Sequence, residues 1–258
     1  MKDPMDDSLV PIIPYEKLDD VATAFLQEYY PAALRIPMRG QDPVWVDPTE
    51  LAKNMGLTVK NQRIREDDSV FGQIYFDDTD TVMYDANEDA DVPTHIKGKT
   101  IVVDPQIYLL RNLGSFNNTI VHECVHWAKH CKAFKLEQLF NTDASYISCE
   151  VVGDADSRIS IKSTKYMEKQ ANQLAPRIQM PKEPFTIKAK EYIAYFMRQT
   201  DARHTVDVME MVIGALERDY GVSRQAVKIR LVELGFEEAV GTFNYVDGHY
   251  VKPHGFRK

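Results

Sequence analysis

The residues with the clearest chemical potential form the short segment His122-Glu-Cys-Val-His126. On a helix, positions four apart share a face, so both histidines can present an imidazole nitrogen to one metal ion. Glu123 lies about 100° round the helix from His122, so it can act as a general base without competing for the metal. This is the H-E-x-x-H pattern of two zinc ligands and one catalytic carboxylate. The same pattern also occurs by chance on surface helices, so it needs support from the rest of the chain.

The residues around the motif predict an amphipathic helix. An apolar stripe beside the histidine face would bury one side and leave the ligands facing a cleft; it consists of Val121, Cys124, Val125, Ala128 and Cys131. Cys124 is expected to project away from the metal. His130, one turn after His126, could line the cleft or serve as a cation at the helix C-terminus, and we favour the second interpretation.

A catalytic zinc needs a third protein ligand and keeps its fourth position for water. No further histidine follows in the H-x-x-G-x-x-H arrangement. Glu168 lies in a helical segment, with Asn172 one turn later on the same face. This pair could place a carboxylate on zinc and a polar group on the second nitrogen of a ligand histidine. Taken alone, Glu168 is better explained as a solvated helix charge.

Composition narrows the class of protein. The chain has 258 residues, a formal charge of −8, 44% hydrophobic and 27% charged residues, which excludes disordered, collagen-like and coiled-coil proteins. The acidic balance argues against nucleic acid as the main partner. The chain has only three cysteines and no signal peptide, which indicates a soluble cytoplasmic protein. It has no run of 18 apolar residues, so we expect no helix that spans a membrane.

An α+β fold is predicted to position these residues. β-branched and aromatic runs of period two predict a small, mainly antiparallel sheet, with strands at 57–61, 70–76, 81–84, 100–104 and 145–152. Helical periodicity predicts helices at 14–30, 47–56, 105–113, 115–132, 163–179, 185–199, 204–219 and 222–235. An Asp-Gly turn predicts a hairpin in the tail. We divide the chain into a flexible leader with an N-terminal helix (1–44), a metal-site domain (45–185) and a C-terminal helical extension (186–258).

Two segments in combination resemble a known family. His122-Glu-Cys-Val-His126 is followed, 42 residues after His126, by Glu168-Lys-Gln-Ala-Asn-Gln-Leu-Ala175 and then Met180-Pro181. This combination resembles the ImmA/IrrE family of zinc metallopeptidases over about residues 45–185. The resemblance implies a zincin-like core, with His122, His126 and Glu168 as zinc ligands. It also implies that Glu123 is the catalytic base. Asn172 would contact and orient a zinc ligand without binding zinc itself.

The chain departs from the family pattern at two positions of the second segment. Gln170 replaces the usual second Glu, and Leu174 replaces Phe. Neither is a proposed ligand, so the predicted site survives. Pro176 falls inside the helical stretch and cannot donate a backbone hydrogen bond, so we expect a kink behind the site.

The segment 221–231 has two interpretations. It resembles the second half of a helix-turn-helix, with Ser223 as the cap of a helix that carries three basic residues. It also resembles the C-terminal helices of longer family members. The charge of −8 favours packing of Val227, Leu231 and Leu234 against the metal-site domain over DNA binding.

Two features of substrate handling stay open. An oxyanion stabiliser is needed, and the plausible tyrosines are Tyr75, Tyr108, Tyr146 and Tyr166. The strand at 70–76 is a candidate edge that binds an extended substrate by strand addition.

The sequence thus favours a zinc-dependent endopeptidase that acts on a protein substrate. By resemblance, that substrate is a helix-turn-helix repressor in a bacterium or mobile element. The alternative is a non-catalytic zinc protein that binds a partner protein or DNA through its C-terminal helices. Two histidines and a carboxylate also suit iron(II), and the H-E-x-x-H helix favours zinc.

Overall fold

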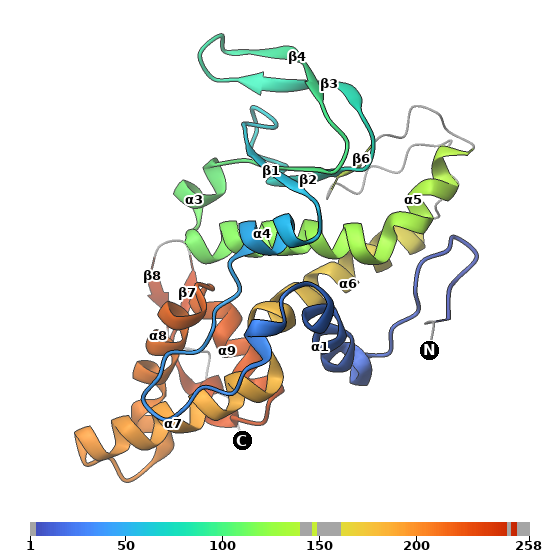
Figure 1. The fold of residues 1–258 in the computed structure, drawn as a ribbon. Helices are drawn as coiled ribbons and strands as arrows, with labels where there is room; N and C mark the ends of the chain where they lie inside the picture. The colour runs from blue at the N-terminus through green and yellow to red at the C-terminus, as the bar shows by residue number, and fades with distance from the viewer. Residues whose placement is uncertain (1–3, 140–145, 149–160, 247–248, 252–258) are drawn as a thin grey trace. The chain divides into compact units, whose positions relative to one another are not determined.

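The computed structural model describes residues 4–139, 146–148, 161–246 and 249–251 (Figure 1). The chain divides into two compact units. Unit 1 is drawn from residues 1–22 and 47–175, and unit 2 from residues 23–46 and 176–258. Helices and a small sheet occur together, so the predicted α+β class is confirmed. Among the described residues, no helix is both long and apolar enough to cross a membrane.

The sheet of unit 1 has four short strands in the order β1-β5-β2-β6. These are β1 (Thr58–Asn61), β2 (Gly72–Tyr75), β5 (Thr100–Val103) and β6 (Tyr146–Ser148). β2 pairs antiparallel with both β5 and β6, whereas β1 pairs parallel with β5. The sheet is therefore mixed, with two of its three pairings antiparallel. The prediction that 70–76 forms an edge strand is wrong, because β6 pairs with the outer side of β2.

A long hairpin extends the β part of unit 1. It consists of β3 (Thr79–Asp85) and β4 (Ala90–Ile96), which pair antiparallel and lie at the top of Figure 1. A small cluster of buried side chains joins the hairpin and the sheet: Ile64, Val70, Tyr75, Met83, Ile96 and Val102. All four residues of β2 and of β5 are buried.

Helix α4 (Leu113–Val125) carries the motif and lies along the sheet (Figure 1). Asn112 caps it, with its Oδ1 accepting the Ser115 N–H at 2.8 Å. After Val125 the chain makes one π-helical turn, η3 (His126–His130), and continues as α5 (Cys131–Gln138). The single helix predicted over 115–132 is therefore interrupted at the second histidine of the motif. π-Helical turns of this kind are frequent at functional sites.

Three further helices complete unit 1 or begin in it. α2 (Pro48–Asn54) starts as predicted, with the Asp47 carboxylate accepting the N–H groups of Thr49 and Glu50. α3 (Gln106–Leu110) precedes α4. α6 (Ile161–Gln179) carries Glu168 and continues through Pro176, where the division between the two units falls.

The N-terminal segment belongs to unit 1 and does not form a free leader. Val10 is fully buried, and its N–H donates to the Asp6 carboxylate at 2.8 Å. The short turn η1 (Tyr15–Lys17) and helix α1 (Leu18–Tyr29) follow. The expectation of a flexible segment over residues 1–14 is therefore wrong for the described residues 4–14.

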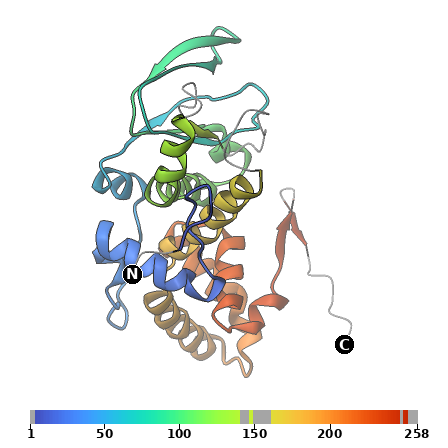
Figure 2. The ribbon, with the colours of Figure 1, turned by 90° about the vertical axis from the view of Figure 1, so that its right-hand side faces the viewer.

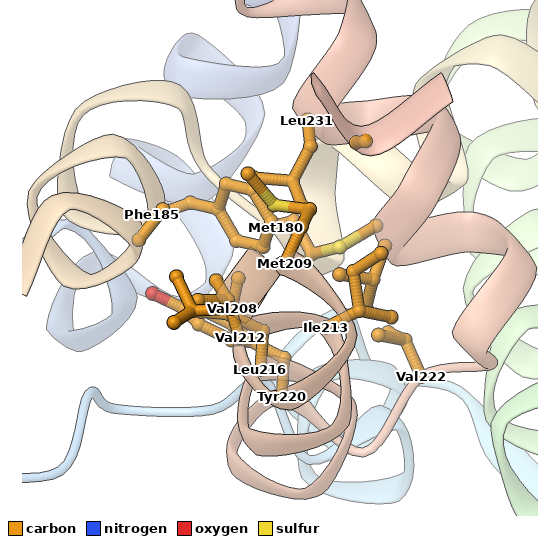
Figure 3. Packing of buried hydrophobic residues seen from close by; sticks show 13 residues of the cluster. Met180, Phe185, Val208, Met209, Val212, Ile213, Leu216, Tyr220, Val222 and Leu231 are labelled. Atoms are coloured by element: carbon orange, nitrogen blue, oxygen red, sulfur yellow. The ribbon is translucent and has the colours of Figure 1, made fainter. Parts of the chain in front are cut away.

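Unit 2 is mainly helical and has its own core. Its elements are η2 (Pro31–Leu34), α7 (Lys182–Thr200), η4 (Thr205–Val208), α8 (Met209–Tyr220), α9 (Arg224–Glu233) and η5 (Glu237–Gly241). Side chains from α7, η4, α8, α9 and η5 form one cluster (Figure 3), which includes Phe185, Met209, Ile213, Leu216 and Leu231. The rings of Phe185 and Tyr220 lie 5.2 Å apart. The antiparallel strands β7 (Asn244–Val246) and β8 (His249–Val251) form the predicted tail hairpin (Figure 2).

The basic side chains of α9 are engaged within unit 2. Arg224 forms an ion pair with Glu210, Lys228 donates to the Thr242 carbonyl, and Arg230 donates to the Met180 carbonyl. Val227 and Leu231 are buried in the core of unit 2, in one cluster with Met180 and Phe185. The basic character of this helix is therefore used in intramolecular contacts.

Candidate metal centre

Unit 1 brings together the three side chains predicted to bind a metal. His122 lies on α4, His126 begins the π-helical turn and Glu168 lies on α6, and their donor atoms all fall within 4.8 Å of one another. The two Nε2 atoms are 3.0 Å apart. Each Nε2 lies 3.2 Å from an oxygen of the Glu168 carboxylate. Three donors from two helices therefore converge on one point.

The separations fit a tetrahedral ion. Zinc holds nitrogen and oxygen donors at about 2.0–2.1 Å, which places two donors of a tetrahedron about 3.3 Å apart. The observed values of 3.0 and 3.2 Å are close to this separation. Among the described residues, no fourth side chain joins the group. Two histidines and one carboxylate are a ligand set that zinc sites in proteins use.

Charge within the site also suits a cation. Burial acts to raise the pKa of Glu168, but its hydrogen bonds and ion pairing with His122 and His126 outweigh burial and hold that pKa well below its usual range. Burial acts to lower the pKa of His122, whereas the carboxylates of Glu168 and Glu123 raise it above 6.5. The carboxylate is thus anionic, and the imidazole is in a negative field that favours an added positive charge.

This charge state predicts how metal binding depends on pH. A histidine must lose its proton to bind a metal, and the pKa of His122 is raised. Below that pKa, zinc must therefore displace a proton from His122. We expect the apparent zinc affinity to fall by about tenfold for each pH unit below the pKa of His122. Competition titrations with a chelator between pH 5.5 and 8 measure this slope, and a flat profile over that range would contradict it.

Glu123 is fully buried beside the ligands. The backbone of β2 approaches it closely at Gly72. A Cβ atom built at Gly72 would lie 2.9 Å from Glu123 Oε1 and 2.5 Å from the Cγ2 atom of Thr119, and both distances are shorter than real contacts. Gly72 is thus required by space, because it lets the sheet lie directly on the side chain predicted to be the catalytic base.

The Gly72→Ala variant is expected to lose activity without losing metal. The added methyl group displaces the Glu123 carboxylate, which we expect to reduce hydrolysis about 10–100-fold, since misplacement of a reacting group by about 1 Å has such an effect. Zinc binding should change less than about threefold, because the ligands are not displaced.

Two variants serve as controls for this prediction. Gly72→Ala with Thr119→Ser removes the closer clash and keeps the one with Glu123, so it should stay impaired. Gly214→Ala on α8, where an added Cβ would meet its nearest atom at 3.9 Å, should keep wild-type activity. Full activity of Gly72→Ala would contradict the proposed role of the close approach.

Behind the ligands, the structure differs from prediction. His130 is fully buried; its Nδ1 lies 2.9 Å from Nδ1 of His126, and its Nε2 lies 2.9 Å from Oε1 of Gln170. Burial, and to a lesser extent the neighbouring His126, lowers the pKa of His130 to about 3, so the prediction of a cation at a helix end is wrong. Asn172 is solvent-exposed, and Gln170 occupies the position behind the histidines that Asn172 was expected to fill.

Sequence reasoning did not assign functions to Gly72 and Gln170. The position of His130 behind the ligands could have been inferred from its spacing. It lies four residues after His126, as His126 lies four residues after His122, so all three share one helix face. In the sequence, Gln170 stands out only as a departure from a family pattern. Gly72 had no signal in the sequence, since its importance comes from a contact between strand and helix.

The tyrosines considered as oxyanion stabilisers occupy different environments. Tyr75 is buried and its hydroxyl donates to Oε1 of Gln73 at 2.8 Å. The Tyr166 hydroxyl lies 3.1 Å from the backbone N of Ile13, and Tyr108 is exposed. The side chain of Tyr146 lies outside the described residues.

The cysteines near the motif are free thiols, and their environments differ. Cys124 is fully buried, which raises its pKa well above the usual range, whereas Cys131 is partly exposed. The thiolate is the reactive form, so we expect iodoacetamide to label Cys131 in the native protein and Cys124 only after denaturation. Peptide mass spectrometry measures both sites; labelling of native Cys124 at the rate of Cys131 would contradict this expectation. Cys149 lies outside the described residues.

Comparisons with known proteins add little to what the geometry shows. No protein-family model matches the chain, and no curated protein matches it. Among solved structures, a Mycobacterium tuberculosis transcriptional regulator is similar, with a TM-score of 0.42 and 15% sequence identity. The match covers 84% of this chain and 46% of that protein, so the chain spans less than half of the regulator's length.

Proposed function

We propose that this protein is a zinc-dependent endopeptidase that hydrolyses a peptide bond in a protein substrate. The observation that carries the proposal is the convergence of His122, His126 and Glu168 at 3.0–3.2 Å, with the buried carboxylate of Glu123 on the same helix. The ImmA/IrrE-like pattern of the sequence supports it, because the pattern names these same four residues.

The residues of the site divide into those that hold the ion and one that handles protons. Zinc, if held by His122, His126 and Glu168, would supply Lewis-acid chemistry toward water and the scissile carbonyl. Glu168 provides the anionic ligand, and the two imidazoles provide neutral ones. Glu123 takes the proton of the attacking water and returns it to the leaving amine. Gly72 allows the sheet to exclude water from the far side of that carboxylate.

The proposed substrate is a helix-turn-helix repressor in the cytoplasm. The resemblance to the ImmA/IrrE family suggests this class, and the formal charge of −8 is compatible with a basic DNA-binding substrate. To test this, the zinc-loaded protein is incubated with candidate repressors, above all any encoded beside it, and the fragments are mapped by mass. We expect one discrete cleavage that a chelator abolishes. Intact repressors under all these conditions would contradict the proposed substrate class.

A further inference from the structure

The N-terminal segment contacts the side of the metal site that faces away from the ligand donors. Val10 packs against Ala133 of α5 and Met167 of α6. The Asp6 carboxylate accepts the hydroxyl of Ser163 at 2.8 Å. These contacts hold the segment on the two helices that flank the ligands.

From this segment a chain of hydrogen bonds leads to a predicted metal ligand. The Pro11 carbonyl lies 2.5 Å from Nε2 of Gln170. Oε1 of Gln170 lies 2.9 Å from Nε2 of His130, whose Nδ1 lies 2.9 Å from Nδ1 of His126. The Nε2 atom of His126 then faces Glu168 at 3.2 Å. His126, His130 and Gln170 are all buried, so these contacts are shielded from water.

The direction of every hydrogen bond in this series follows from the first one, which the Pro11 carbonyl accepts. A backbone carbonyl can only accept, so the amide nitrogen of Gln170 faces Pro11 and the amide oxygen faces His130. That oxygen requires a proton on Nε2 of His130, which leaves Nδ1 of His130 as an acceptor. His126 must then donate from Nδ1, which leaves its Nε2 as the nitrogen that can bind a metal in place of a proton.

We propose that His130, Gln170 and the Pro11 carbonyl are positioning groups that fix the tautomer of His126 and aim its Nε2 at the metal. The N-terminal segment thereby helps to orient a metal ligand through the Pro11 carbonyl. This inference rests on the proposed function, since it takes His126 as a ligand. It also explains the residue type at position 170, because a glutamine can accept from His130 and donate to Pro11, whereas an ionised glutamate can only accept.

The tautomer of His126 is the direct test. Long-range ¹⁵N–¹H spectra of the full-length, metal-free protein distinguish Nδ1–H from Nε2–H imidazoles. We expect a proton on Nδ1 of His126 in the wild type, and partial or complete loss of that proton in His130→Phe. A purely structural role for His130 would not change this signature. A His126 ring without a proton on Nδ1 in the wild type would overturn the inference.

Zinc affinity, measured by competition with a chromogenic chelator, provides a second readout. We expect His130→Phe and Gln170→Leu each to weaken zinc binding about 10–100-fold, as is usual when a partner of a ligand histidine is removed. The double variant should lose no more than the larger single loss, because the two residues act in series. Gln170→Glu should bind zinc within about threefold of the wild type, since it still accepts from His130, but amide exchange over residues 8–13 should accelerate.

A matched control separates this effect from general destabilisation. Phe134→Leu changes a buried residue one turn after His130 and should leave zinc affinity within about threefold. Wild-type affinity in His130→Phe, or losses that multiply in the double variant, would overturn the inference and leave the proposed function standing. A wild-type protein that binds no zinc would instead contradict the proposed function, and the tautomer measurement would still test the hydrogen-bond chain.

Discussion

The Glu123→Gln variant is expected to bind zinc like the wild type and to hydrolyse its substrate about 10³-fold more slowly, within the usual range for loss of a general base. The amide has the shape of the carboxylate, and Glu123 is not one of the three converging donors. The metal site is therefore preserved. What is lost is the group that accepts a proton from the attacking water.

Two measurements are needed on the same preparation. Zinc content after gel filtration should stay near one per chain, and cleavage of the repressor should be followed over time by mass. Glu137→Gln on α5 is a matched control, because it also replaces a buried carboxylate by an amide. We expect it to keep wild-type rates. Equal rates for Glu123→Gln and the wild type would show that the mechanism is wrong.

The ligand-bearing helix was predictable because its evidence is local. His122 and His126 lie four apart, and helical geometry places them on one face in any context. In the predicted apolar stripe, Val121, Cys124 and Val125 are buried, whereas Ala128 and Cys131 are partly exposed. Glu168 could not be assigned from periodicity, since it is distant in sequence and an exposed charge was the simpler explanation. Only the combined pattern of two segments singled it out, and the structure places it beside both histidines.

Features that depend on distant contacts could not be predicted. The run 70–76 has the composition of a strand, but the sequence does not tell which strands flank it, and β6 occupies its outer side. The first residues looked like a flexible leader because they are acidic and rich in proline. Their order comes from contacts with helices far along the chain, such as the one between Asp6 and Ser163.

Removal of the third ligand should have the other large effect. We expect Glu168→Gln to weaken zinc binding by more than about 100-fold, beyond the effect of losing an outer partner of a ligand. A neutral amide is a poor ligand for zinc, and the negative charge that raises the pKa of His122 is lost with it. Zinc should then also stop raising the melting temperature, because a ligand stabilises a fold only in proportion to its binding.

Metal analysis and thermal unfolding with and without zinc measure both consequences for Glu168→Gln, again with Glu137→Gln as the control. Stoichiometric zinc in Glu168→Gln would show that another residue is the third ligand. The two glutamate variants together separate the functions of the two carboxylates. Glu123→Gln should hold zinc and stay inactive at any zinc concentration, whereas Glu168→Gln should be empty at stoichiometric zinc and regain part of its activity in excess zinc. Glu168→Gln is expected to recover because Glu123, His122 and His126 remain in place. What this variant lacks is mainly affinity for the ion.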